Sequence, residues 1–329
     1  MDKGTMAFLG KICRRFCRIS AKIYPMEKLD LKVKIGKLVL KTPVLCASGT
    51  FGFGSELNGL ADFSSIGAVI AKTITLQPRA GNPPPRIYET ECGVINSVGL
   101  ENPGLEGFIR EKLPELKKLP ADFIVSVGGF SFEEYAAIVR RLDKEKAVKA
   151  FEINLSCPNL QLKKIISQDA KLTYQLTGLL RKATRKTLII KITPEVTDIS
   201  QIAKAVEDGG ADGLALVNTF FAMAINIQTA RPYIGSGYGG YSGKAVKPMA
   251  LYRVWKAAGS VNIPVVGGGG IETADDAIEF ILAGATAVSV GTQNMVCPSC
   301  SRDILAGIKQ YMRRRKIANL GLLRGAAGR

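Results

Sequence analysis

Short apolar runs rich in β-branched residues alternate with longer amphipathic stretches along most of this chain. The runs are typical of buried strands in a parallel sheet, and the stretches are typical of the helices that connect such strands. Eight runs can be placed, at Val44–Ala47, Ala68–Thr73, Phe123–Val127, Phe151–Leu155, Leu188–Ile192, Gly213–Asn218, Pro264–Gly267 and Ala287–Val290. The expected helices lie near residues 105–118, 132–143, 169–184, 199–208, 248–258, 273–283 and 302–315.

The number of runs favours a closed barrel over an open sheet. Eight parallel strands with their helices form a (β/α)8 TIM barrel, and 329 residues suit one such domain. An open dinucleotide-binding sheet would need an early G-x-G-x-x-G turn, which the first run lacks. We therefore predict an α/β barrel over residues 29–316, preceded by a basic amphipathic extension at 1–28 and followed by a basic tail at 317–329.

The composition excludes several kinds of site. Histidine is absent, which removes Ser-His-Asp triads, Cys-His pairs and most zinc or haem sites, so we expect no metal. Acid-base chemistry must come from Cys, Lys, Asp, Glu, Ser or Tyr. Seven cysteines without a dense framework indicate a reducing, cytoplasmic setting, and no apolar window is long enough for a membrane span.

The net charge of +17 is concentrated partly at the two ends of the chain. In residues 1–25, apolar side chains alternate with basic ones at helical spacing, as in an amphipathic surface helix. Translation could also begin at Met26. The basic ends are interpreted either as solvated faces or as contacts with a partner or an anionic membrane. Aromatic side chains are not interleaved with these charges, which argues against nucleic acid.

Polar or glycine residues follow each predicted strand, where barrel enzymes build their sites. The glycines after the seventh and eighth strands stand where barrels commonly bind phosphate, although tight turns would also use glycine. Lys191 and Lys72 lie inside apolar runs, so each needs a partner. For Lys191 this partner is either a structural carboxylate or a flavin ring; Lys72 could hold a substrate carboxylate.

Cys157 follows the fourth strand directly and stands before Pro158, between amide side chains. A lone cysteine is often a small buried hydrophobe, but this position favours a general base with a reference pKa of about 8.5. Asn96, Asn154 and Asn218 would suit a ligand that both donates and accepts hydrogen bonds, as a pyrimidine ring does.

Five motifs, taken in order, resemble the class 1 dihydroorotate dehydrogenases, and especially the catalytic subunit of the class 1B branch. The resemblance covers about residues 29–312. The motifs are Ala47–Gly54, the stretch from Lys72 through Gly81-Asn82-Pro83 to Arg86, Asn96–Gly104, Asn154–Asn159 and Gly239–Gly243.

The resemblance implies an FMN enzyme that oxidises dihydroorotate to orotate in pyrimidine (UMP) biosynthesis, with Cys157 as the base. The substrate would be lined by Lys72, Asn96, Ser97, Val98, Gly99, Leu100, Asn154, Asn218 and Thr219. The residues that would hold FMN are Ser48, Lys72, Thr73, Asn154, Lys191, Val217, Gly243, Gly269, Gly270, Gly291 and Thr292. It also implies a homodimer, which could pair with an iron-sulfur and FAD subunit that passes electrons to NAD.

Several positions depart from the family pattern. Ser126 stands where many relatives have asparagine, and Tyr241 and Lys244 replace leucine and proline. The loop after Cys157, Leu160–Ile166, lacks the usual glycines, and Cys297-Pro298-Ser299-Cys300 is either a loop or half of a redox or metal site. Two alternatives stay open: a dihydropyrimidine dehydrogenase-like flavin barrel, and a non-catalytic barrel that binds phosphate ligands or membrane surfaces.

Overall fold

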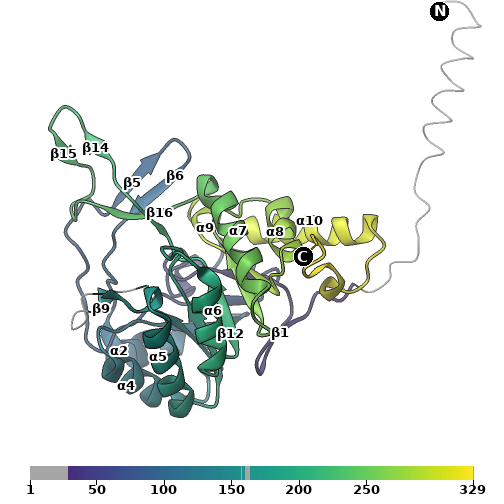
Figure 1. Ribbon diagram of the computed structural model, residues 1–329, viewed down its shortest axis with the longest axis horizontal. Coiled ribbons are helices and arrows are strands. Elements are labelled where there is room, and N and C mark those ends of the chain that lie inside the picture. Colours follow the sequence, from purple (N-terminus) through teal and green to yellow (C-terminus); the bar gives the residue numbers. More distant parts are fainter. Residues whose placement is uncertain (1–28, 157, 160–163, 329) are drawn as a thin grey trace, which may run out of the picture.

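Eight parallel strands close into a barrel in the computed structural model, which describes residues 29–156, 158–159 and 164–328 (Figure 1). The order around the barrel is β11-β12-β17-β18-β3-β4-β7-β8. The strands are β3 (Val44–Cys46), β4 (Ala68–Ile70), β7 (Asp122–Val127), β8 (Ala150–Asn154), β11 (Thr187–Lys191), β12 (Gly213–Leu216), β17 (Val265–Gly268) and β18 (Ala287–Val290). Each predicted run overlaps one of them, so the predicted fold class is confirmed.

Helices cover the outside of the barrel and bury one face each against it (Figure 1). They are α2 (Gly104–Gly107), the π-helix η2 (Phe108–Lys112), α3 (Leu113–Leu116), α4 (Phe132–Asp143), α5 (Ala170–Ala183), α6 (Ile199–Asp208), α7 (Lys247–Ala258), α8 (Ala274–Leu282), α9 (Thr292–Val296) and α10 (Cys300–Arg314). Short 3-10 turns are η1 (Ser55–Leu57), η3 (Ile166–Gln168), η4 (Lys244–Val246) and η5 (Leu320–Leu323). Within the described ranges, no helix combines the length and apolar character that crossing a bilayer requires.

Side-chain caps explain where several of these helices begin. Ser131, Asp169, Asp198 and Thr273 each accept a hydrogen bond from a backbone N–H in the first turn of the following helix, at α4, α5, α6 and α8. Short polar side chains are preferred at this position because they satisfy donors that the helix itself leaves free. The sequence therefore fixes the point at which the chain turns back along the outside of the barrel.

The amino-terminal ends of the strands are closed by a hairpin and by the last residues of the described chain. The hairpin pairs β1 (Val33–Ile35) with β2 (Leu38–Leu40). The backbone N–H of Asp30 donates to the Ala318 carbonyl at 2.7 Å, and that of Leu320 donates back to the Asp30 carbonyl at 3.0 Å. Leu320 and Leu323 are buried in the main core, so this part of the expected tail packs on the barrel. The expected extension at 1–28 lies outside the described residues.

A small antiparallel sheet lies over the carboxyl ends of the strands, in the order β13-β16-β6-β5. Its strands come from two distant parts of the chain. One part supplies the hairpin of β5 (Ile87–Thr90) with β6 (Gly93–Asn96), and the other supplies β13 (Phe220–Ala222) and β16 (Gly239–Ser242). A second hairpin, β14 (Ile225–Asn226) with β15 (Arg231–Pro232), projects beside it (Figure 1). The remaining pair, β9 (Pro158–Asn159) with β10 (Lys164–Ile165), follows β8. This upper sheet was not expected from the sequence, and it narrows the barrel mouth.

An ion pair between α7 and α8 gives a testable stability contribution. Lys247 Nζ lies 2.6 Å from Asp276 Oδ1, and Asp276 also completes the capping box with Thr273. Partial burial alone would raise the pKa of Asp276, but hydrogen bonds from Lys247, Glu272 and Thr273 outweigh it and hold the pKa below its ordinary value. We expect Asp276→Asn to lower the free energy of unfolding by about 1–3 kcal/mol at neutral pH.

The pH dependence of that loss follows from the lowered pKa. The carboxylate stabilises the fold above its unfolded pKa, and this contribution is lost as pH falls through the folded pKa. Urea unfolding at pH 7 and near pH 3 should therefore show a large difference between wild type and variant only at the higher pH. Asp303→Asn, in the exposed first turn of α10, is the control. Equal effects of the two substitutions would contradict the assignment.

Candidate active site

A cavity of about 770 Å³ opens at the carboxyl ends of the barrel strands and extends beneath the upper sheet. Its wall includes residues at or just after the ends of all eight strands, because parallel strands deliver their carboxyl ends to the same side of a barrel. Examples are Ser48 after β3, Lys72 after β4, Asn154 at the end of β8 and Lys191 at the end of β11. The volume lies within the range of small-molecule and cofactor sites.

Every candidate site residue that the structure describes lines this one cavity. They are Ser48, Lys72, Thr73, Asn96, Ser97, Val98, Gly99, Leu100, Asn154, Lys191, Val217, Asn218, Thr219, Gly243, Gly269, Gly270, Gly291 and Thr292. Cys157, the candidate base, lies outside the described residues. The individual roles of these residues stay predictions, whereas their convergence on one cavity is observed.

Two asparagines, one at the end of β8 and one just after β12, are joined at the cavity wall across the intervening strand β11. The Nδ2 of Asn218 donates to Oδ1 of Asn154 at 3.1 Å, and this same oxygen accepts from the backbone N–H of Ser156 at 3.2 Å. The Tyr135 hydroxyl donates to the Asn154 carbonyl at 2.7 Å and holds the end of β8 from the α4 side. The orientation of both amides is therefore fixed by the protein, which favours specific recognition of a polar ring.

The loop after β6 forms another wall of the cavity. Asn96 Nδ2 donates to the Gly240 carbonyl at 3.1 Å, so the upper sheet positions this amide. Ser97 Oγ accepts from Asn82 Nδ2 at 2.8 Å and from the Ser236 hydroxyl at 2.7 Å. Gly99 has a φ of 75°, and a Cβ there would lie 2.4 Å from Asn82 Oδ1. Glycine at this position allows the loop to pass close to Asn82.

A buried ion pair lies at the floor of the cavity. Lys191 Nζ is 3.7 Å from Glu152 Oε1, and the Glu152 side chain is 3% exposed. That carboxylate oxygen has no hydrogen-bond partner. Burial raises the pKa of Glu152, while the Lys191 charge acts in the opposite direction. The structural carboxylate expected for Lys191 is therefore observed, and because Lys191 also lines the cavity, its contact with a flavin stays a prediction.

Three glycines from two segments form a narrow cradle on the far wall. Gly243, Gly269 and Gly270 have φ values of 107°, 118° and 76°, which side chains rarely adopt. A Cβ on Gly269 would lie 2.7 Å from Ala250 Cβ, and one on Gly270 would lie 2.9 Å from the Gly243 carbonyl oxygen. The backbone can approach a ligand closely here, as anion-binding loops require.

Three hydroxyl groups form a chain behind β3 and β4. Ser48 Oγ lies 3.2 Å from Thr73 Oγ1, which lies 2.8 Å from Ser126 Oγ. Ser48 and Thr73 line the cavity, and Ser126 is buried behind them. The serine at position 126, noted as a departure from the family, therefore supports a cavity residue and does not itself line the cavity.

The sequence analysis missed several residues of the cavity wall. Arg79 stacks its guanidinium 4.6 Å from the centre of the Phe130 ring, and both line the cavity. Glu152 was missed as well, although a carboxylate inside the apolar segment Ala-Phe-Glu-Ile-Asn carries the same signal as the lysine inside β11. Tyr238 and Ser236 lie in the connection before β16, where no sequence pattern pointed to the cavity.

None of the cysteines that the structure describes lines the cavity. Cys46 is buried in the barrel, and burial raises its pKa. Burial also raises the pKa of Cys300 to about 11, and its thiol donates to Asn294 Oδ1 at 3.4 Å. Among residues 29–156, 158–159 and 164–328, no group of three or more Cys, Asp or Glu side chains is arranged to hold a metal ion. The Cys297–Cys300 segment leads into α10.

Comparison with known proteins identifies close relatives over nearly the whole chain. Residues 30–312 match the family model described as dihydroorotate dehydrogenase. A protein of Thermoanaerobacter pseudethanolicus, named dihydroorotate dehydrogenase B (NAD(+)), catalytic subunit, is 47% identical over 285 residues, or 86% of this chain and 94% of that protein. The protein of the same name from Geotalea uraniireducens is 45% identical over 302 residues, which cover 92% of this chain and 99% of that protein.

A solved structure shows the same fold. The crystal structure of dihydroorotate dehydrogenase from Eimeria tenella in complex with ferulenol superimposes with a TM-score of 0.76, covering 97% of this chain and 95% of that one, at 23% identity. This likeness supports the barrel architecture alone.

Proposed function

Because the chain belongs to the dihydroorotate dehydrogenase family, we propose that it oxidises (S)-dihydroorotate to orotate in pyrimidine synthesis, with FMN as its flavin. The observation that carries this proposal is the convergence of all the described candidate residues on one cavity. The sequence motifs that contain them are separated by long stretches of chain, so their meeting in space is independent support.

The cavity wall fits FMN in three respects. The glycine cradle at Gly243, Gly269 and Gly270 leaves backbone exposed for a phosphate group. The hydroxyls of Ser48, Thr73 and Thr292 could donate hydrogen bonds to, and accept them from, the polar edge of the flavin ring and the ribityl chain. Lys191 supplies a cation at the cavity floor, balanced by Glu152. When bound, FMN would supply the hydride acceptor for the oxidation.

The substrate would lie between the amides and the upper sheet. Lys72 is a cation at the cavity wall that suits the carboxylate of dihydroorotate. The amide groups of Asn96, Asn154 and Asn218 could pair with the ring N–H and carbonyl groups. Because Asn154 and Asn218 are already joined, little rearrangement is needed when substrate binds.

Cys157 would remove the proton from C5 of the substrate while the hydride leaves C6, so that a carbon-carbon double bond forms. Its thiolate is the proton acceptor, and the resulting thiol must return that proton to solvent before the next turnover. The position is adjacent in sequence to Ser156 and close to Asn154, both of which line the cavity. A base near the described polar groups can act on a substrate that those groups orient.

Electrons would leave through another protein. We propose a homodimer that pairs with an iron-sulfur and FAD subunit and passes electrons to NAD, in accord with the names of the relatives. Exposed apolar side chains on the segment from β13 to β15, such as Ile225 at 56% and Ile227 at 85%, support association with a protein partner. Light scattering of the purified chain, alone and co-expressed with such a subunit, tests both contacts.

The reaction is tested by anaerobic bleaching of the bound flavin. Purified protein should be yellow and should bleach rapidly with dihydroorotate, but not with dihydrouracil, which lacks the carboxylate that Lys72 would bind. If dihydrouracil bleached the flavin and dihydroorotate did not, the proposed substrate would be wrong, whereas the assignment of a flavin-binding barrel would stand. If the purified protein carried no flavin and bound none when FMN was added, the proposed flavin-dependent reaction would be contradicted.

Gly269→Ala tests the cradle separately from catalysis. The added methyl would lie 2.7 Å from Ala250 Cβ at a φ of 118°, so the segment must move away from the position that would hold the phosphate. We expect FMN affinity to fall by about tenfold or more, since a strained backbone of this kind costs about 1–3 kcal/mol. Fluorescence titration of the apoprotein with FMN measures this affinity. Gly178→Ala, in α5 with no atom closer than 4.0 Å, should bind FMN as wild type does.

A further inference from the structure

A second cavity, of about 490 Å³, lies at the amino-terminal ends of β7, β8 and β11, opposite the candidate active site. Its wall consists of Lys37, Leu38, Val39, Asp122, Asp143, Lys149, Arg185 and Lys186. Four of these side chains are cationic and two are carboxylates. The proposed reaction uses none of them.

The carboxylates of this wall are already engaged. Asp122 pairs with Lys149 at 2.8 Å, and Asp143 accepts a short hydrogen bond from the Thr184 hydroxyl. The remaining cations are balanced less well. Lys37 Nζ donates to the Arg185 carbonyl at 3.0 Å, and Lys186 Nζ donates to the Glu145 carbonyl at 2.7 Å, which are dipoles and carry no full charge.

Arg185 is the most available of these groups. It is exposed on the loop between α5 and β11, and its guanidinium has no partner among the residues that the structure describes. Burial lowers the pKa of Lys186, against the opposing charges of Asp143 and Glu145, so a bound anion would relieve an unfavourable environment. The cavity wall therefore carries more cationic side chains than carboxylates, and its most exposed cation has no partner within the described residues.

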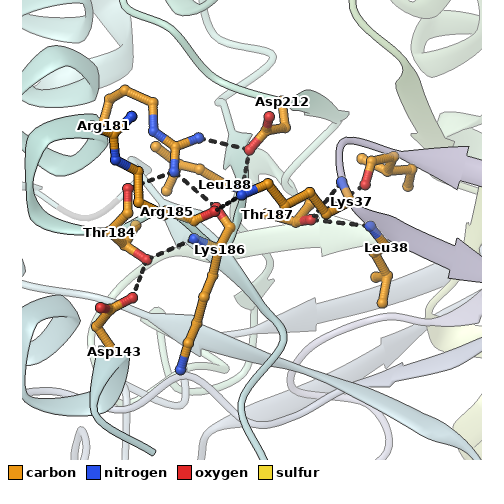
Figure 2. A network of polar contacts seen from close by, with 11 residues as sticks. Lys37, Leu38, Asp143, Arg181, Thr184, Arg185, Lys186, Thr187, Leu188 and Asp212 are labelled. Atoms are coloured by element: carbon orange, nitrogen blue, oxygen red, sulfur yellow. Dashed lines mark hydrogen bonds and ion pairs between the residues drawn. The ribbon is translucent and has the colours of Figure 1, made fainter. Parts of the chain in front are cut away.

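The loop that carries Arg185 is held in place from several sides (Figure 2). Arg181 Nη2 donates to the carbonyls of Thr184 at 2.6 Å and Lys186 at 2.8 Å, and its Nη1 pairs with Asp212 at 2.7 Å. Asp212 also accepts from the backbone N–H of Leu188 at 2.9 Å. These contacts fix the backbone on both sides of Arg185.

The β1–β2 hairpin is attached to the same loop. The backbone N–H groups of Lys37 and Leu38 both donate to Thr187 Oγ1 at 3.1 Å (Figure 2). The backbone positions from which the cations of the hairpin and of the loop extend are therefore held at a constant separation. A ligand that binds between them needs to order the side chains but not the backbone, which lowers the cost of binding.

We propose that this basal cavity binds a small molecule that carries a phosphate group and has the size of a nucleotide. The planar guanidinium of Arg185 matches phosphate with two parallel hydrogen bonds, and the ammonium groups of Lys37 and Lys186 add charge. Leu38 and the exposed Val39 offer an apolar side for the remainder of the ligand. The volume lies within the range typical of small-molecule sites.

Isothermal titration of flavin-loaded protein tests the site, because FMN then fills the phosphate position proposed at the barrel mouth. The probes are uridine monophosphate, adenosine monophosphate and pyrophosphate. Arg185→Ala should weaken the tightest of them by about tenfold or more. Lys256→Ala removes the same charge from an exposed position near the end of α7 and should leave affinity unchanged.

The outcomes separate the sources of the phosphate. Tighter binding of a nucleoside monophosphate identifies a nucleotide ligand, and tighter binding of pyrophosphate identifies a free phosphate compound; both support the site if Arg185→Ala weakens them. If Arg185→Ala and Lys256→Ala lowered the affinity for the probes equally, the binding would be general electrostatic attraction and the proposal would be overturned. The proposal would also be overturned if none of the three probes bound. The bleaching assay is unaffected by either result, so this proposal can fail independently of the proposed reaction.

Discussion

Replacing Cys157 with alanine is expected to slow flavin bleaching by dihydroorotate by about 100- to 10,000-fold, the usual contribution of a positioned general base. The proton on C5 would then have no acceptor at the cavity, whereas the groups that would hold substrate and FMN remain. The variant should therefore keep its bound flavin and its affinity for orotate. Rapid-mixing absorbance under anaerobic conditions measures the rate, and a spectral titration with orotate measures the affinity.

The matched control for this substitution is Cys92→Ala. Cys92 is exposed at the turn between β5 and β6, so its loss removes a thiol without changing the cavity wall. Bleaching of the Cys92 variant should match wild type. If the Cys157 variant bleached at the wild-type rate, another group would have to be the base, and the described cysteines could not supply it from the cavity.

Removing the charge of Lys191 is expected to have the largest effect on stability. Lys191→Met leaves the carboxylate of Glu152 buried and without its counter-charge, which typically costs about 3–5 kcal/mol. Methionine preserves most of the side-chain volume, so little of this loss comes from a void. FMN should also be retained poorly, because the cation at the cavity floor is gone. Urea unfolding and the flavin-to-protein absorbance ratio measure the two effects.

The pH dependence of the stability loss in Lys191→Met shows whether the buried charge of Glu152 causes it. Without Lys191, Glu152 would fold preferentially in its protonated form, so its already raised pKa would rise further. A carboxyl whose pKa is higher in the folded state contributes stability at low pH and loses it as pH rises through that value. The deficit of Lys191→Met should therefore grow from pH 5 to pH 8.

The double variant Lys191→Met with Glu152→Gln should recover much of the stability, since it leaves no buried charge. Additive losses would show that the pair does not interact. Lys149→Met provides a comparison, because Lys149 lies closer to its partner Asp122, at 2.8 Å, but is 64% exposed. Its loss should cost less than about 1 kcal/mol.

The sequence was sufficient to predict the barrel, because each strand is buried on both faces and leaves a continuous apolar run. It also predicted the cavity residues at the strand ends, since these must meet once the barrel closes, whereas the loop residues Ser97–Leu100 were identified through the family resemblance. It did not predict the upper sheet. The strands of that sheet are short, and β16 is rich in glycine. Although β5 and β6 form a local hairpin, β6 also pairs with β16 far along the chain, so no local period reveals the sheet.

Two charged features were missed for different reasons. Glu152 carried a usable signal, because a lone carboxylate in an apolar strand needs a partner, and Lys191 in the neighbouring strand was already identified. The basal cavity carried no such signal. Its cations belong to separate loops in which lysine and arginine are ordinary solvated residues, and only the folded barrel brings Lys37 next to Arg185.

The order in which these contacts can form has a consequence for synthesis of the protein. The barrel closes where β18 pairs with β3, and Asp30 is held by Ala318, Asn319 and Leu320. At about 5–20 residues per second, a ribosome needs on the order of ten seconds or more between making the two halves of each contact. Throughout that interval β3 presents an unpaired edge, which in other nascent sheets attracts foreign strands. Closure of the barrel therefore waits for the synthesis of β18, and a chain that stops before β18 would keep an open seam beside β3.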